Sequence, residues 1–263
     1  MGVNLKITTV QTTLVWEDAD ANLAHFQGLI DTVAETDIIV LPEMFTTGFS
    51  MDAERLGKLS GKKATDWMLQ ISATKNAVVL GSMITEDEGK YYNRLYVAFP
   101  DGCLLKYDKR HLFSLANEDK HYTAGTDKLI FEYKGWKICP LVCYDLRFPV
   151  WSRNRKTEAG FDYDVLIYVA NWPERRAYAW KALLPARAIE NQSYVVGVNR
   201  IGDDGNGIYH SGDTVVYDFK ADKLSSTESG KESVETVELN RHDMEVFRRA
   251  YAFLSDADQF TIG

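Results

Sequence analysis

Residues 136–149 read Trp-Lys-Ile-Cys-Pro-Leu-Val-Cys-Tyr-Asp-Leu-Arg-Phe-Pro, and this stretch decides the fold. Its first half, 136–142, alternates and is apolar enough to predict a buried strand. Cys143 follows at once and precedes a segment that we expect to be helical. A residue between a buried strand and a helix lies on a sharp turn with its side chain exposed, a geometry that suits a nucleophile. The stretch therefore predicts a layered α/β fold with a candidate nucleophilic cysteine at the end of a strand.

Two other strands end in the same way. Residues 37–41, Asp-Ile-Ile-Val-Leu, are short, apolar and β-branched, as expected of a strand buried on both faces, and Glu43 lies just beyond them. Residues 165–169 form a similar run, which Asn171 and Trp172 follow. We expect all these side chains to share one rim of the fold with the cysteine.

Strands and helices alternate along the rest of the chain. Further strands are expected at 5–11, 77–84, 194–198, 213–219 and 234–239, a hairpin at 91–107, and helices near 18–35, 62–76, 149–158 and 175–191. The stretch 202–207 is expected to be a turn-rich loop. No Pro/Gly/Ser-rich linker interrupts the pattern, so we predict one α/β domain over residues 1–263.

Composition indicates an ordinary globular protein. Of the 263 residues, 45% are hydrophobic and 26% charged. The formal net charge of -8 does not favour binding to nucleic acid or to anionic lipid. The opening residues lack the apolar stretch of a signal peptide, and no window approaches the roughly 18 apolar residues of a membrane span. We predict a cytoplasmic protein without nucleic-acid or membrane partners.

The three cysteines cannot all pair. Cys103 and Cys139 are expected to be small buried residues, and a reduced compartment suits a free thiol at Cys143. No CxxC, HExxH, phosphate-binding glycine loop or full EF-hand pattern is present. The sequence therefore predicts neither a metal nor a cofactor.

A cysteine nucleophile needs a base and a group that stabilises the oxyanion. Glu43, directly after an apolar strand, is a candidate base. His111 and His121 are the alternatives, because histidine is the usual base beside a catalytic cysteine. Lys109 lies in a loop with several basic residues. A fixed ammonium beside a backbone N–H can stabilise an oxyanion without a metal, although a solvated surface charge is its ordinary interpretation.

Three motifs together resemble a known family. Leu41-Pro-Glu-Met, Tyr107-Asp-Lys-Arg-His-Leu-Phe and Cys143-Tyr-Asp-Leu-Arg-Phe-Pro occur in the order and at the spacing of the nitrilase superfamily of carbon–nitrogen hydrolases. The resemblance covers nearly the whole chain. It implies a four-layer α-β-β-α sandwich of two mixed β-sheets with outer helices, and a homodimer or higher homo-oligomer that associates through helices.

The same resemblance implies roles for individual residues. Glu43, Lys109 and Cys143 match the family's catalytic triad, and the backbone N–H of Tyr144 matches its oxyanion donor. Glu118 matches a second glutamate that positions the lysine and the substrate, with a solvated loop residue as the alternative.

The substrate class follows from a finer resemblance. With Ala170-Asn-Trp-Pro-Glu-Arg, the motifs resemble the omega-amidase-like branch, which deamidates dicarboxylate monoamides such as 2-oxoglutaramate or succinamate through a cysteine thioester. Arg147 can pair with a substrate carboxylate, or instead with Asp145 or Asp164. Asn171 and Trp172 are predicted to border the pocket, although packing is the usual role of a tryptophan.

Two other functions stay open. The same triad can act on an aliphatic amide, a nitrile or a carbamoyl amine. A catalytically silent protein with this fold is the alternative from a different class.

Overall fold

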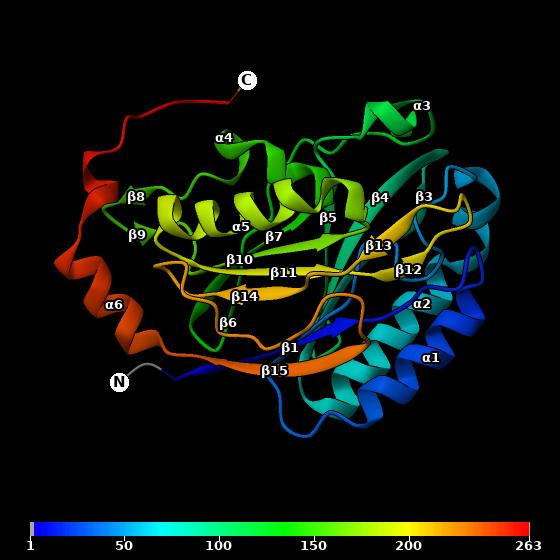
Figure 1. The fold of residues 1–263 in the computed structure, drawn as a ribbon, viewed down its shortest axis with the longest axis horizontal. Coiled ribbons are helices and arrows are strands. Elements are labelled where there is room, and N and C mark those ends of the chain that lie inside the picture. Colours follow the sequence, from blue (N-terminus) through cyan, green and yellow to red (C-terminus); the bar gives the residue numbers. More distant parts are fainter. Residues whose placement is uncertain (1–2, 263) are drawn as a thin grey trace.

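Two mixed β-sheets lie face to face with helices outside them (Figure 1). The computed structural model describes residues 3–262, apart from the side chains of residues 59 and 60. The four layers confirm the predicted α-β-β-α sandwich. Within the described residues, no helix has both the length and the apolar character that crossing a bilayer requires.

The first sheet has six strands, in the order β15-β1-β2-β3-β4-β5. Their bounds are Ser233–Leu239, Leu5–Gln11, Ile38–Val40, Val78–Asp87, Lys90–Ala98 and Leu104–Asp108. The three strands β1, β2 and β3 are parallel, and the outer pairs are antiparallel. Helices α1 (Ala19–Asp31) and α2 (Ala53–Lys75) pack their apolar side chains on the outer face, Phe26 and Met68 among them.

The second sheet has five strands, in the order β14-β11-β10-β7-β6. Their bounds are Val215–Tyr217, Tyr194–Asn199, Val165–Ala170, Trp136–Val142 and Phe131–Tyr133. Strands β7, β10 and β11 are parallel. Helix α5 (Ala177–Asn191) lies on the outer face, where Trp180 and Leu184 are buried.

The main core fills the space between the sheets. Ile7, Val40 and Leu80 of the first sheet belong to the same buried cluster as Ile138 and Val142 of the second. Burying such side chains contributes about 1.5–3 kcal/mol each relative to exposure. This contact fixes the two sheets, and with them the ends of β2, β7 and β10, relative to one another.

Several element boundaries differ from those expected. Helix α2 begins at Ala53, nine residues before the expected 62. The helix expected at 149–158 ends at Ser152 as α4 (Pro149–Ser152), and the chain turns into the short hairpin of β8 (Lys156–Thr157) and β9 (Gly160–Phe161). The physical cause is Asn154, whose buried amide donates to the carbonyls of Tyr163 and Asn191 at 2.9 and 3.0 Å and holds the chain out of helix.

Other elements were not expected. The turn-rich loop expected at 202–207 is the turn of a β-hairpin, and what was not expected is the pair of short strands that it joins, β12 (Ile201–Asp203) and β13 (Tyr209–Ser211). Helix α6 (Arg241–Ala250) packs near the C-terminal end through Arg248, which forms a buried ion pair with Asp164 at 2.6 Å.

Candidate active site

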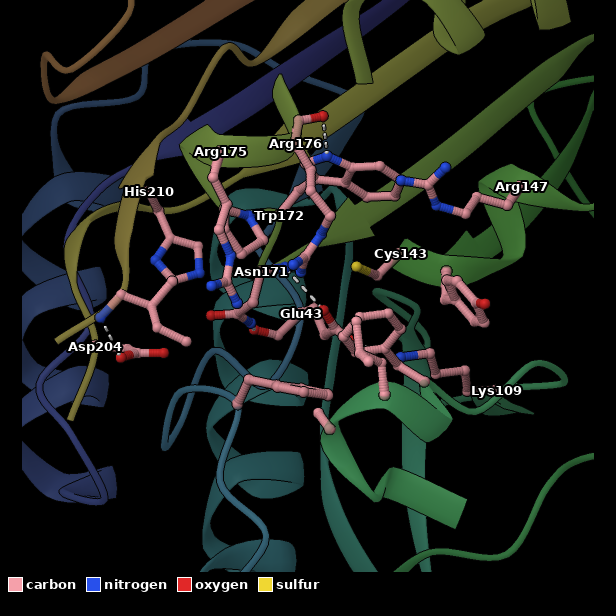
Figure 2. Close-up of a pocket in the computed structure, with 17 residues that line it drawn as sticks. Glu43, Lys109, Cys143, Arg147, Asn171, Trp172, Arg175, Arg176, Asp204 and His210 are labelled. Atoms are coloured by element: carbon pink, nitrogen blue, oxygen red, sulfur yellow. Dashed lines mark hydrogen bonds and ion pairs between the residues drawn. The ribbon is translucent and has the colours of Figure 1, made fainter. Parts of the chain in front are cut away.

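A cavity of about 240 Å³ opens where strands of both sheets end (Figure 2). Seven of the eight site residues predicted from the sequence line it, namely Glu43, Lys109, Cys143, Tyr144, Arg147, Asn171 and Trp172. The eighth, Glu118, does not line the cavity, but its carboxylate lies 2.9 Å from the ammonium of Lys109.

Cys143 lies on a sharp turn, as predicted. It directly follows β7 and begins the 3₁₀ helix η2 (Cys143–Arg147). Its φ of 44° is in the left-handed region, which costs energy for a residue with a Cβ and is typical of functional turns. Tyr144 comes next in the first turn of η2, where backbone N–H groups lack intrahelical acceptors. The turn therefore places the sulfur and free donor groups together.

Lys109 lies between two buried carboxylates. Its Nζ is 2.9 Å from Glu43 Oε1 and 2.9 and 3.0 Å from the two oxygens of Glu118. The lysine side chain is 1% exposed and both carboxylates are fully buried. Burial alone would lower the pKa of Lys109, but Glu118 and Glu43 outweigh it and raise the pKa, so the ammonium stays charged. Neither Lys109 nor Glu118 is the solvated surface residue of the alternative interpretation.

Asn93 of β4 completes this network, and sequence reasoning missed it. Its side-chain N–H donates to Glu43 at 2.8 Å and to Glu118 at 3.1 Å. Its side-chain carbonyl oxygen accepts a hydrogen bond from the Ser82 hydroxyl at 2.8 Å. The Ser82 hydroxyl oxygen in turn accepts one from the backbone N–H of Met44 at 2.9 Å. The amide therefore fixes both carboxylates from the side of the first sheet.

Asn171 joins the two sheets at the site. Its backbone N–H donates to Glu43 Oε2 at 2.7 Å, and its side-chain N–H donates to the Glu43 carbonyl. The remaining acceptor, Oδ1, is buried and has no hydrogen-bond partner among the described residues. Glu43 is therefore oriented by groups from both sheets.

The thiol of Cys143 is protonated in the free protein. Burial and the adjacent Glu43 carboxylate raise its pKa well above 9, and the opposing effect of Lys109 is smaller. The position of Cys143 at the start of η2 does not offset this increase. The five-residue 3₁₀ helix η2 provides only a weak dipole, whereas the carboxylate is close. A base is needed to generate the thiolate.

The histidine alternatives do not lie where a base must be. His111 Nδ1 is 2.7 Å from Asp145, and the ring stacks on Phe148 with the centroids 3.7 Å apart. His121 is exposed on the short helix α3 (Glu118–His121) and does not line the cavity. His111 is a structural residue, as loop histidines usually are.

Arg147 belongs to the cavity wall. Its guanidinium lies over the Trp172 ring, 4.8 Å from the centroid. The alternative ion pairs do not form, because Asp145 binds Tyr107 and His111 whereas Asp164 pairs with Arg248. Trp172 is buried, and its ring forms part of the wall.

Other wall residues were missed. Arg175 and Arg176 come from the 3₁₀ helix η3 (Glu174–Arg176), and Asp204 and His210 come from the unexpected hairpin. Arg175 ends the motif Ala170-Asn-Trp-Pro-Glu-Arg and Arg176 directly follows it, which was the available signal. Cys103 is exposed rather than buried as expected, since it ends the tight turn between β4 and β5.

Comparison with known proteins identifies the family. The carbon–nitrogen hydrolase family model matches residues 6–249. The omega-amidase YafV of Yersinia enterocolitica is 45% identical over 98% of each chain, and the 2-oxoglutaramate amidase of Bacillus subtilis is 38% identical over 75% of this chain and 77% of its own. The crystal structure of XC1258 from Xanthomonas campestris, a CN-hydrolase superfamily protein with an arsenic adduct in its active site, superimposes with a TM-score of 0.94 at 39% identity, covering 99% of this chain and 100% of its own.

The family model spans most of the chain, and the Yersinia enterocolitica relative is 45% identical over 98% of both chains. The chain therefore belongs to the carbon–nitrogen hydrolase family, within the nitrilase superfamily.

Proposed function

We propose that the protein is an amidase that hydrolyses the terminal amide of a short dicarboxylate monoamide, with Cys143 as the nucleophile. The observation that carries this proposal is the buried contact of Lys109 with both Glu43 and Glu118, next to the cavity that Lys109, Glu43 and Cys143 line. Such a network supplies a base and a fixed cation beside a thiol without a metal.

The first half of the reaction forms a thioester. Glu43 takes the proton from Cys143, and the sulfur attacks the amide carbon to form a C–S bond. The carbonyl oxygen becomes an oxyanion, which the Lys109 ammonium and the Tyr144 N–H stabilise. The oxyanion collapses, the C–N bond breaks, and Glu43 returns its proton to the leaving nitrogen, so that ammonia departs.

The second half regenerates the thiol. Glu43 removes a proton from water, and the hydroxide attacks the thioester carbon. The C–S bond breaks, the sulfur of Cys143 recovers the proton from Glu43, and the carboxylic acid product leaves and loses its own proton to solvent. One buried carboxylate thus acts as base and acid twice, and its hydrogen bonds from Asn93 and Asn171 keep it oriented throughout.

The assignment to acidic monoamides rests on relatives and on charge. The relatives named omega-amidase and 2-oxoglutaramate amidase suggest 2-oxoglutaramate or succinamate. Arg147, which has no ion pair among the described residues, is suited to a substrate carboxylate because a guanidinium binds it bidentately. Trp172 forms the wall along the substrate carbons, and the free Asn171 Oδ1 accepts an N–H of the substrate amide.

Ammonia release tests the proposal. Wild type is assayed with 2-oxoglutaramate, succinamate, a neutral aliphatic amide and a nitrile, beside Cys143→Ala. Turnover highest on the two acidic amides and absent in the variant is the expected result. Turnover of only the neutral amide or the nitrile would reassign the substrate, and full activity of the variant would contradict the mechanism.

We further propose that residues 1–263 form one cytoplasmic domain that assembles as a homodimer. Val150 on α4 and Tyr178 and Ile189 on α5 are exposed apolar side chains, and the side chain of Tyr178 is 87% exposed. Such side chains on neighbouring helices favour burial against a second copy. Light scattering of wild type and Tyr178→Glu tests this, with a monomeric variant as the expected result.

A further inference from the structure

The cavity wall includes a cation, Arg176, that has no acidic partner among the described residues. It is half-buried at the end of η3, and its guanidinium lies over the Phe113 ring, 4.9 Å from the centroid, inside the cavity. None of the described carboxylates forms an ion pair with it. Burial, with the neighbouring positive charges of Arg175 and Arg147, lowers its pKa below the usual range without removing its charge. A charge that is partly desolvated and surrounded by like charges is stabilised by a bound anion.

Trp172 links Arg176 to Arg147. Its indole N–H donates to the Arg176 carbonyl at 2.8 Å, and its ring face contacts the Arg147 guanidinium. Figure 2 shows both arginine side chains in the same cavity as Cys143. One buried aromatic residue therefore contacts the Arg147 guanidinium and holds the backbone of Arg176, while the Arg176 guanidinium lies over Phe113.

The charges of the cavity wall favour an anion. Lys109 pairs with two carboxylates, Glu43 and Glu118, and the remaining wall side chains include three arginines and one carboxylate, Asp204, so the four cations exceed the three carboxylates by one. The whole chain carries a net charge of -8, so this local positive excess opposes the overall charge. A positive cleft in an acidic protein concentrates anionic ligands at that place.

We propose that Arg176, together with Arg147, binds the free carboxylate of the substrate and so selects acidic monoamides over neutral amides. The inference rests on the proposed amidase function and extends it to a residue outside the predicted site. Arg147 approaches from η2 and Arg176 from η3, so the two can contact different oxygens of one carboxylate, or of a carboxylate and an adjacent 2-oxo group.

The test compares substrates and ligands in Arg176→Met, Arg176→Lys and wild type. Removing the Arg176 guanidinium should lower kcat/KM for succinamate by roughly 10- to 100-fold. Butyramide lacks the carboxylate, so its kcat/KM should change by less than about 3-fold. Arg176→Lys, which keeps the charge, should recover part of the loss. Arg249→Met, which removes an exposed arginine on α6, serves as the control.

A binding measurement separates this inference from the chemistry. Calorimetry with succinate is done on Cys143→Ala and on the same protein with Arg176→Met, where we expect a Kd about 10- to 100-fold weaker. Equal Kd values, or equal losses on succinamate and butyramide, would overturn the role of Arg176. If wild type hydrolyses none of the amides, the proposed function fails, whereas the succinate result still decides whether Arg176 binds a carboxylate.

Discussion

Asp145 holds His111 at two points. Its Oδ1 accepts the backbone N–H of His111 at 3.0 Å and lies 2.7 Å from the ring Nδ1. His111 is two residues after Lys109, and Asp145 is two residues after Cys143. One buried carboxylate therefore ties the segment that carries the ammonium to the turn that carries the thiol.

Replacing Asp145 with alanine should loosen both segments. Its other oxygen accepts from Tyr107 OH at 2.7 Å and from the Val142 N–H at 3.0 Å, so four donors lose their acceptor. We expect the free energy of unfolding to fall by about 2–4 kcal/mol and kcat to fall more than KM rises. Urea denaturation and steady-state kinetics measure the two effects. Unchanged kcat in a destabilised variant would show that the tie is structural only.

Lys109→Met should destabilise the fold in a pH-dependent manner. Removing one partner of a buried ion cluster costs about 3–5 kcal/mol, because Glu43 and Glu118 then remain buried without a cation. Burial already raises the pKa of Glu118, and a carboxyl group with a raised folded pKa loses stability as the pH rises. The deficit should therefore be largest at neutral pH and shrink toward about pH 5. Denaturation curves at several pH values check this, and a deficit that grows on acidification would contradict it.

Glu43→Gln should make Cys143 more acidic while abolishing turnover. Burial, Glu43 and Glu118 raise the thiol pKa whereas Lys109 lowers it, so loss of the Glu43 charge removes one of the raising effects and should lower the pKa. The rate of alkylation by iodoacetamide, followed against pH, should rise at a lower pH than in the wild type. The Cys103→Ser background removes the exposed thiol. Burial raises the pKa of Cys139 to about 12, so this thiol should not react with iodoacetamide over the same pH range. An alkylation profile shifted to higher pH would contradict the proposed role of Glu43.

Gly125→Ala should displace the backbone of Asp108 and Lys109, and with it the Lys109 side chain. The Gly125 N–H donates to the Lys109 carbonyl at 3.0 Å, and an added Cβ would lie 2.1 Å from the Asp108 carbonyl oxygen. We expect the free energy of unfolding to fall by roughly 1–3 kcal/mol and activity to fall with it. Gly28→Ala is the matched control, because open space surrounds that position in α1 and alanine favours helix. Equal behaviour of the two variants would show that no close approach exists at Gly125.

The sequence predicts the parts of the site that follow buried strands. Glu43, Cys143 and Asn171 were found because β2, β7 and β10 are short apolar runs whose ends are easily located. Asn93 was missed because it lies inside β4, where the sequence does not say which face meets the other sheet. Its role follows only from the packing of the two sheets.

Arg176 was missed for a different reason. It belongs to a three-residue 3₁₀ helix that has no periodicity to detect, and the wall opposite it comes from the hairpin β12–β13, whose glycines suggested a loop. The early end of α4 likewise depends on the contacts of Asn154 with residues distant in the chain. Short elements held by tertiary contacts give little signal in the sequence.

Asn171 connects Glu43, at the end of a strand in the first sheet, to the second sheet, which also carries Cys143. The base and the thiol thus belong to opposite halves of the polypeptide and meet only when the layers have docked. During folding, an exposed Cys143 is an ordinary thiol without a neighbouring base. The catalytic pair therefore exists only in the fully packed molecule, so any variant that separates the two sheets should lose activity as well as stability.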